Sequence, residues 1–384
     1  MIRNSTIYNN LRRVKYFILR NMMKIFWIFP IDCQKVVCSN FNGKGFGDNP
    51  KYISRELSKK GAMKIYWLTA DNTQSYPEYI TPIKYKSLIS IYHLATAKVW
   101  IDNNRKEPYI SKRKKQVYLQ TWHGSIALKK IEKDAESSLN DFYISNAKRD
   151  SKMINLMISN SSFADNMFGK SFWYDGKIIK SGSPRLDILF DHDIEKSIRK
   201  QLRIKEESFV ILYAPTFRNS QRLDVYDINV EWVKKAFEAL GHEHVVFLFR
   251  VHPNLLNRIE IDKWNGVIDV SQYADVYELL AISDVLITDY SSLMFEFPTA
   301  IAKPVFCYAK DIEEYDRGFY FNLDDLPFSV SKSNEELVMS IKNFDKKKYK
   351  HKLDLFYSGI GLKEDGHASE RIAETLIRMA GNVK

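Results

Sequence analysis

Cysteine is scarce in this chain, which has only Cys33, Cys38 and Cys307 among its 384 residues. Three scattered thiols are too few for a disulfide framework or a structural zinc site, and they are typical of a reducing cytoplasm. The sequence also lacks short internal repeats and low-complexity tracts. Its hydrophobic and charged fractions, 45% and 27%, are those of a soluble globular protein.

The first 31 residues contain no acidic side chain, although they carry six cations interleaved with aromatic and aliphatic residues. Lys24 interrupts the apolar region, and Pro30-Ile31-Asp32 is no small-residue cleavage site, so a secretory signal fits this segment poorly. The uncharged run is far shorter than the roughly 20 residues of a spanning helix. We expect residues 1–32 to form a basic amphipathic helix on an anionic membrane surface. The alternative is a helix that packs its apolar face on the body of the protein.

The net charge of +11 indicates a negatively charged partner, such as a phosphorylated substrate, an anionic membrane or a nucleic acid. The basic run Lys112-Arg113-Lys114-Lys115 is the natural candidate for nucleic acid. However, aromatic stacking residues are not grouped around it as a single-strand binder requires. We therefore expect no nucleic-acid partner.

Short apolar strands alternate with helical stretches along the whole chain, which is the βαβ pattern of parallel sheets. A charged helical segment, residues 191–207, separates two such series, and 384 residues favour two domains. We expect doubly wound Rossmann-type α/β domains at residues 33–190 and 191–384, facing a central cleft, with a C-terminal helix in the second. The predicted strands are Lys35–Phe41, Lys64–Thr69, Lys98–Asp102, Gln116–Thr121, Met153–Ser159, Lys177–Lys180, Phe209–Ala214, Val245–Val251, Val267–Val270, Asp284–Thr288 and Pro304–Tyr308.

Two histidines follow predicted strands, one in each half of the chain. His123 stands in Gln120-Thr121-Trp122-His123-Gly124-Ser125, and His252 ends the run from Val245 and is followed by Pro253. Open parallel sheets bind their ligands at this carboxyl edge. A single strand-end histidine is more often structural, so the argument depends on what accompanies it.

Other strand ends carry residues suited to phosphate. Tight turns or strand ends present Arg185, Thr216 and Arg250, and Ser291 and Ser292 open a predicted helix, where backbone amides favour anions. Glu296, one turn into that helix, is placed to reach a ribose hydroxyl. Taken individually, these serines are interpreted as helix caps, Arg185 as part of a surface salt bridge, Glu296 as a solvated helix charge, and Asp48 and Asp365 as turn residues. Together they favour a nucleoside diphosphate.

The same blocks resemble the CDP-glycerol glycerophosphotransferases, which build wall teichoic acids and related capsular polymers. The resemblance runs in order from about residue 35 to the C-terminus. It is carried by Phe41–Pro50, Trp122-His123-Gly124-Ser125, Ser181-Gly182-Ser183-Pro184-Arg185, Tyr213-Ala214-Pro215-Thr216, Arg250-Val251-His252-Pro253, Thr288-Asp289-Tyr290-Ser291-Ser292 and Asp365-Gly366-His367-Ala368-Ser369.

This resemblance implies a GT-B-like fold, with an acceptor-side first domain and a donor-binding second domain. It implies transfer of glycerol phosphate from CDP-glycerol to a hydroxyl of a lipid-linked saccharide or polyol-phosphate acceptor, with release of CMP at the cytoplasmic face of the membrane. His123 matches the family's proposed base, and His252 is a second catalytic candidate. The remaining matched positions would bind the donor: Gly124, Ser125, Arg185, Pro215, Thr216, Arg250, Ser291, Ser292 and Glu296.

Two departures from the family pattern stand out. Ser125-Ile126 replaces the usual Thr-Pro, and Glu296 stands where many members have Asp. From the resemblance we expect a protein without the long extra N-terminal domain of the large polymerases, more similar to the short primases and capsule transferases. With no DxD-type cluster at the strand ends, we expect no obligatory metal and no cofactor. A CDP-ribitol donor, or a GT-B glycosyltransferase that uses a nucleotide sugar, remains the alternative.

Overall fold

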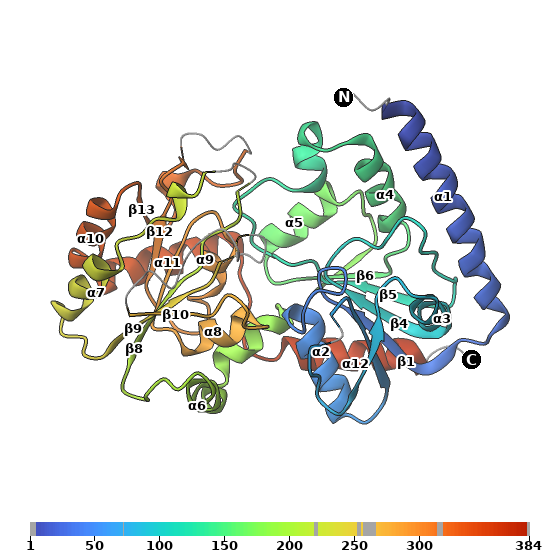
Figure 1. Cartoon of the computed structure of the whole chain (residues 1–384), viewed down its shortest axis with the longest axis horizontal. Coiled ribbons are helices and arrows are strands. Elements are labelled where there is room, and N and C mark those ends of the chain that lie inside the picture. The colour runs from blue at the N-terminus through green and yellow to red at the C-terminus, as the bar shows by residue number, and fades with distance from the viewer. Residues whose placement is uncertain are drawn as a thin grey trace. The chain divides into compact units, whose positions relative to one another are not determined.

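The computed structural model describes residues 5–71, 73–218, 222–251, 255, 266–312 and 318–381. The chain divides into two compact units. The first contains residues 1–125, 131–185 and 367–384, and the second contains residues 126–130 and 186–366. Each unit is built on a parallel sheet, which confirms the predicted pair of α/β domains (Figure 1).

The first unit has seven parallel strands in the order β3-β2-β1-β4-β5-β6-β7. Sequence order reverses between β1 and β4, which is the kind of switch point at which Rossmann folds bind their ligands. Asn103 follows β4, and His123 follows the neighbouring β5. The strands are β1 (Asp32–Ser39), β2 (Lys64–Thr69), β3 (Ile80–Lys84), β4 (Ala97–Asp102), β5 (Val117–Gln120), β6 (Leu156–Ser159) and β7 (Lys177–Lys180).

The last helix of the chain packs on this first sheet. Ile372, Ala373 and Leu376 are fully buried in a core that also contains Ile53 and Leu57 of the helix after β1 (Figure 1). The sequence-based boundaries placed this helix with the second domain, because sequence order carries no sign of which sheet a terminal helix covers. Helices of this unit are α1 (Ser5–Ile25), α2 (Asp48–Lys59), α3 (Leu88–Thr96), α4 (Asp141–Ser151), α5 (Ser162–Ser171) and α12 (Ala368–Gly381), with 3₁₀ turns η1 (Phe26–Ile28) and η2 (Glu132–Ser138). The 3₁₀ turn η3 (Pro184–Phe190) begins in this unit and continues into the second.

The second unit has six parallel strands in the order β10-β9-β8-β11-β12-β13. Here the order reverses between β8 and β11, so the loops that carry Thr216 and Asp289 begin at adjacent strand ends. Strands are β8 (Phe209–Tyr213), β9 (Val245–Phe249), β10 (Val267–Asp269), β11 (Val285–Thr288), β12 (Val305–Tyr308) and β13 (Ser329–Ser331). Helices are α6 (His192–Gln201), α7 (Val230–Glu238), α8 (Val276–Ile282), α9 (Leu293–Glu296), α10 (Asn334–Lys342) and α11 (Lys346–Ile360), with 3₁₀ turns η4 (Asp224–Tyr226) and η8 (Leu323–Asp325).

The apolar composition of the middle strands accounts for their position inside both sheets. The middle strands β4, β5, β6, β11 and β12 are buried at every position, as expected when helices cover both faces of a parallel sheet. In the described ranges, no helix is long and apolar enough to cross a lipid bilayer.

Candidate active site

The chain makes a sharp turn directly after β5. Trp122 adopts a left-handed φ of 53°, which is costly for a bulky side chain. Its N–H donates to Oε1 of Gln120 at 2.9 Å, and its ring packs edge-on against Phe172. Such strain is characteristic of functional turns, and the residue that it presents is His123.

His123 is half-buried between two aromatic rings. The ring centroid of Trp122 lies 4.1 Å from the imidazole, and that of Phe41 lies at 5.2 Å. Nδ1 lies 2.8 Å from the backbone carbonyl oxygen of Asn103. Burial lowers the pKa of His123, although the bond to Asn103 and the nearby Asp48 carboxylate partly oppose this shift. The imidazole is therefore neutral at physiological pH, as a general base must be.

The loop after β1 approaches the same turn. Gly43 has a φ of 87°, and a Cβ at this position would lie 3.0 Å from the Ala70 nitrogen, so only glycine fits without a backbone shift. The loop leads into α2, where the side-chain amide of Asn49 donates to the carbonyl of Trp122 at 3.3 Å. Phe41, next to His123, belongs to this loop as well.

Arg185 lies in the interior of the first unit. Its side chain is 1% exposed, and Nη1 donates to Oδ2 of Asp48 at 2.9 Å. Its backbone N–H also donates to Asn49 at 3.1 Å. In this structure Arg185 therefore connects its own turn to the β1 loop, whereas its predicted role as a donor ligand requires an exposed guanidinium.

Gly124 and Ser125 are buried immediately beyond His123. The hydroxyl oxygens of Ser125 and Ser183 lie 3.2 Å apart, so the His123 loop is connected to the Ser181–Arg185 turn. On the other side, Arg371 of α12 donates to the Ser181 carbonyl, and Ser369 donates to that of Pro184. The C-terminal signature block thus supports the turn that carries Arg185.

Arg218 is the centre of the polar site in the second unit. It donates to Asp289 at 2.7 Å, to both carboxylate oxygens of Asp311 at 2.8 and 3.0 Å, and to the Thr216 hydroxyl at 2.7 Å. The Thr216 N–H donates to Asp289 as well. Burial opposes ionisation of Asp311, yet the bond from Arg218 holds the pKa of that carboxyl below its ordinary value. Pro215, buried just before Thr216, fixes the start of the loop.

The other residues of this unit that were predicted to bind the donor are Arg250, Ser291, Ser292 and Glu296, and they lie outside the Arg218 network described above. Arg250 donates from Nη1 to the carbonyls of Val270 and Tyr273, and burial lowers its pKa. Ser291 and Ser292 are half-buried, before a helix of only four residues. Glu296 is fully buried and accepts a 2.6 Å bond from the Tyr277 hydroxyl. His252 lies outside the described residues.

A family model described as CDP-Glycerol:Poly(glycerophosphate) glycerophosphotransferase matches residues 21–378. The chain belongs to this family. Its relatives include the "Teichoic acid poly(glycerol phosphate) polymerase" of Staphylococcus epidermidis, 31% identical over 95% of this chain and 54% of that protein. They also include the "Teichoic acid glycerol-phosphate transferase" of Staphylococcus aureus, 30% identical over 88% of this chain and 92% of that protein. The chain thus spans about half the length of the first relative and most of the second.

Solved structures of the wall teichoic acid polymerase TagF superpose on the chain with a TM-score of 0.82. They are 28–29% identical and cover 99% of both chains, and one comes from a crystal soaked with CDPG. This likeness confirms the predicted GT-B-like fold class of the glycerophosphotransferase family.

Sequence reasoning missed several residues that organise these family signatures. Asp48 was interpreted as a turn residue, and no role was predicted for Asn103, for Asp311 or for Arg105, which donates to the Glu132 carboxylate at 2.7 Å. Asn103 could have been found, because it follows β4 at the switch point of the first sheet. Asp311 also follows a strand, β12, but it belongs to none of the signature blocks.

Proposed function

We propose that the chain transfers glycerol phosphate from CDP-glycerol to a hydroxyl of a lipid-linked acceptor and releases CMP, as a step in teichoic-acid-type polymer synthesis. The observation that carries this proposal is the neutral, oriented imidazole of His123, within a chain that matches its family over residues 21–378. Further support comes from the S. aureus glycerol-phosphate transferase, which is similar over 92% of its length.

His123 would act as the base. Its Nε2 takes the proton of the acceptor hydroxyl while that oxygen attacks the β-phosphorus, which bears the glycerol. The bond between this phosphorus and the bridging oxygen breaks, and CMP leaves with the bonding electrons. Protein groups contribute to such a transfer by positioning and by stabilising charge.

Arg250 is the strongest candidate for binding the diphosphate. Its observed hydrogen bonds go to backbone carbonyls, and the nearby Asp275 carboxylate only partly offsets the effect of burial on the pKa of Arg250. Arg218, in contrast, is neutralised by Asp289 and Asp311, and its role would be to hold the Thr216 loop. The Ser291 and Ser292 hydroxyls would add neutral donors. Because α9 is a single turn, these hydroxyls matter more than a helix dipole.

The N-terminal helix α1 would bring the enzyme to the cytoplasmic face of the membrane. One side of α1 packs on the first unit: Arg20 donates to the Pro108 carbonyl at 2.8 Å, Tyr16 stacks on Tyr109, and Met23 is fully buried. The other side exposes an apolar stripe at spacings of three and four residues. Its members, between 44% and 66% exposed, are Leu11, Val14, Ile18, Met22 and Ile25.

An amphipathic helix that packs on a protein core buries its apolar side, whereas α1 exposes this apolar stripe. Exposed lysines, Lys15 and Lys24, accompany the stripe. Apolar side chains inserted at the headgroup boundary, with cations near anionic lipid, are the two contributions that hold interfacial helices. A lipid-linked acceptor would then be presented at the same surface.

The decisive experiment is release of CMP from a panel of CDP-polyols, with a lipid-linked disaccharide as acceptor. CMP release from CDP-glycerol, with glycerol phosphate recovered on the acceptor, supports the proposal. Turnover of CDP-ribitol alone would reassign the donor. Consumption of a nucleotide sugar, with release of a nucleoside diphosphate, would make the chain a glycosyltransferase and overturn the proposal.

A further inference from the structure

The loop after β4 contacts His123 through its backbone. The Asn103 carbonyl oxygen lies 2.8 Å from Nδ1. A carbonyl can only accept, so Nδ1 must carry the hydrogen in this contact. In the neutral ring Nε2 then holds the lone pair, which is the atom that a base needs. The tautomer of His123 therefore depends on where the Asn103 carbonyl is held.

The side chain of Asn103 fixes one end of this loop. Its amide donates to Oδ1 of Asn40 at 2.7 Å, and its Oδ1 accepts from the Phe41 N–H at 2.8 Å. Both partners belong to the loop after β1, across the switch point of the sheet. Asn103 is fully buried, so water does not compete for these bonds.

Arg105, two residues further on, anchors the same loop in the interior. It donates to Glu132 at 2.7 Å, to the Ser151 hydroxyl at 2.9 Å and to Asp150 at 3.3 Å. Burial alone would lower the pKa of Arg105, but the two carboxylates raise it above its ordinary value. A buried, fully charged guanidinium with several fixed acceptors holds its backbone in one place.

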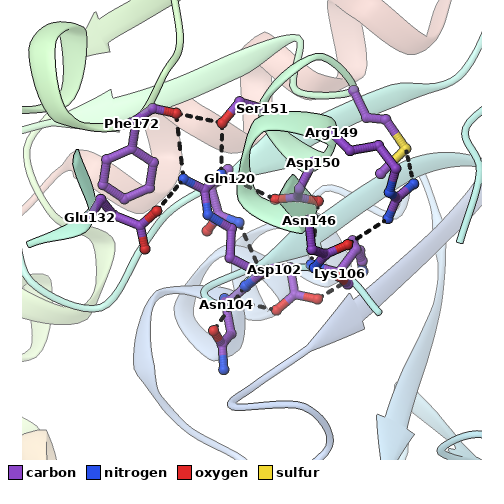
Figure 2. A network of polar contacts seen from close by, with 12 residues as sticks. Asp102, Asn104, Lys106, Gln120, Glu132, Asn146, Arg149, Asp150, Ser151 and Phe172 are labelled. Carbon is purple, nitrogen blue, oxygen red and sulfur yellow. Dashed lines mark hydrogen bonds and ion pairs between the residues drawn. The ribbon is translucent and has the colours of Figure 1, made fainter. Parts of the chain in front are cut away.

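Further bonds immobilise the rest of the loop. Lys106 donates to Asp102 at 2.8 Å, and the Gln120 side chain donates to the Asn104 carbonyl at 2.9 Å. Figure 2 shows this network, with Asp150 and Ser151 on one side and Asp102 and Asn104 on the other.

The same guanidinium supports the ring that lies on His123. Arg105 lies 4.5 Å above the Phe172 ring, and Phe172 packs edge-on against Trp122. Trp122 in turn lies against the imidazole. Arg105 therefore acts on His123 by two routes, through the Asn103 carbonyl and through the Trp122 ring.

We propose that Asn103 and Arg105 are positioning residues, which hold His123 as the Nδ1–H tautomer with Nε2 free to accept a proton. The catalytic consequence rests on the proposed function, whereas the tautomer itself can be measured without any substrate. Neither residue needs to touch the donor or the acceptor.

The test uses the full-length protein with ¹⁵N-labelled histidine. At a pH above the histidine pKa, NMR should show His123 as a single tautomer with hydrogen on Nδ1, assigned by comparison with His123→Gln. An Nε2–H tautomer in the unmodified protein overturns the proposal, whatever reaction the chain catalyses. If no CDP-polyol releases CMP, the proposed function fails while the tautomer result stands.

Two variants then test the positioning. Asn103→Ala removes the side-chain bonds to Asn40 and Phe41 but leaves the backbone carbonyl. Arg105→Lys keeps the positive charge but loses the two guanidinium nitrogens that bond to Glu132, Asp150 and Ser151. Both should give a mixture of tautomers and lower kcat by about tenfold, with KM for CDP-glycerol unchanged. Gln116→Ala is the matched control, because this buried amide bonds to Leu94 and Ala97 before the start of β5. A single unchanged tautomer in both folded variants, or the same mixture in the control, overturns the proposal.

Discussion

Asp48 and Arg185, separated by 137 positions in sequence, form a buried ion pair with a 2.9 Å contact. Their side chains are 6% and 1% exposed. The pair joins two signature blocks of the family inside one unit, and so a residue matched to donor binding is engaged in holding the base-bearing region together.

Breaking this pair should destabilise the first unit. Arg185→Met leaves the Asp48 carboxylate buried without its cation, and we expect a loss of about 3–5 kcal/mol in the free energy of unfolding. Adding Asp48→Asn should recover part of that loss, since the uncompensated charge is then gone. Urea unfolding of the single and double variants measures both effects. Equal stability of Arg185→Met and the unmodified protein would show that the pair is not structural.

Replacing the proposed base should abolish most of the turnover without changing the affinity for the donor. His123→Ala is expected to lower kcat by about 10²–10⁴ and to leave CDP-glycerol affinity nearly intact. Steady-state kinetics and calorimetry separate the two. A folded variant that keeps most of its turnover would remove His123 from the mechanism.

The pH dependence of kcat/KM should reflect the titration of the His123 imidazole. Burial lowers the pKa of His123, so the neutral base persists below the ordinary histidine pKa of about 6.5. The acid limb of kcat/KM is therefore expected below pH 6.5. An acid limb above that value would assign the titration to another group.

Donor affinity should depend on the second unit. Arg250→Ala, or Ser291→Ala with Ser292→Ala, should weaken CDP-glycerol binding as well as turnover, because these groups would contact charge that is present before transfer. Lys350→Ala, an exposed cation of α11 paired with Asp354, serves as the control. Calorimetric affinities that match the unmodified protein in every variant would move the donor site elsewhere.

The exposed stripe of α1 should govern membrane binding. Ile18→Ser with Ile25→Ser replaces two stripe side chains that are 53% and 63% exposed, so vesicle binding should fall while the fold is retained. The control is Asn21→Ser, an exposed polar position of the same helix. Cosedimentation with anionic vesicles measures the effect, and transfer to a short-tailed soluble acceptor should persist. Undiminished cosedimentation of the double variant contradicts the role.

His93 should make stability depend on pH. Burial, together with the nearby Lys35, lowers its pKa to about 4. Between pH 4 and the unfolded value of about 6.5, the unfolded chain binds more protons, so stability falls as pH falls through this window. His93→Phe should flatten that dependence in thermal unfolding, and an identical slope in the variant would contradict the assignment.

Local pattern was enough to predict most of the fold. Most strands were predicted within a residue or two, since runs such as Val285–Thr288 are continuously apolar. The predicted starts of β1 and β6 are each three residues away from the observed ones. The edge strand β3 was missed because Pro82 interrupts an exposed pattern, as edge strands permit. The three-residue β13 offers too little sequence to detect.

Local pattern predicted much less about the candidate site. His123 follows its strand as expected, but the group that orients it is the backbone carbonyl of Asn103, which no side-chain pattern can indicate. Likewise, no sequence pattern indicated that the Glu296 carboxylate accepts a bond from the Tyr277 hydroxyl in the core. Side-chain partners between distant segments follow from packing, which a single sequence does not contain.

The position of α12 has a consequence for how the protein is made. The first sheet emerges early from the ribosome, yet the helix that covers part of it is encoded after residue 366. At roughly 5–20 residues per second, synthesis of the intervening second unit takes on the order of ten seconds or more. During that interval the surface around Ile53 and Leu57 lacks its cover, and truncation before Ala368 would make the interval permanent. Synthesis of α12, rather than synthesis of the first sheet, is the event that allows this core to close.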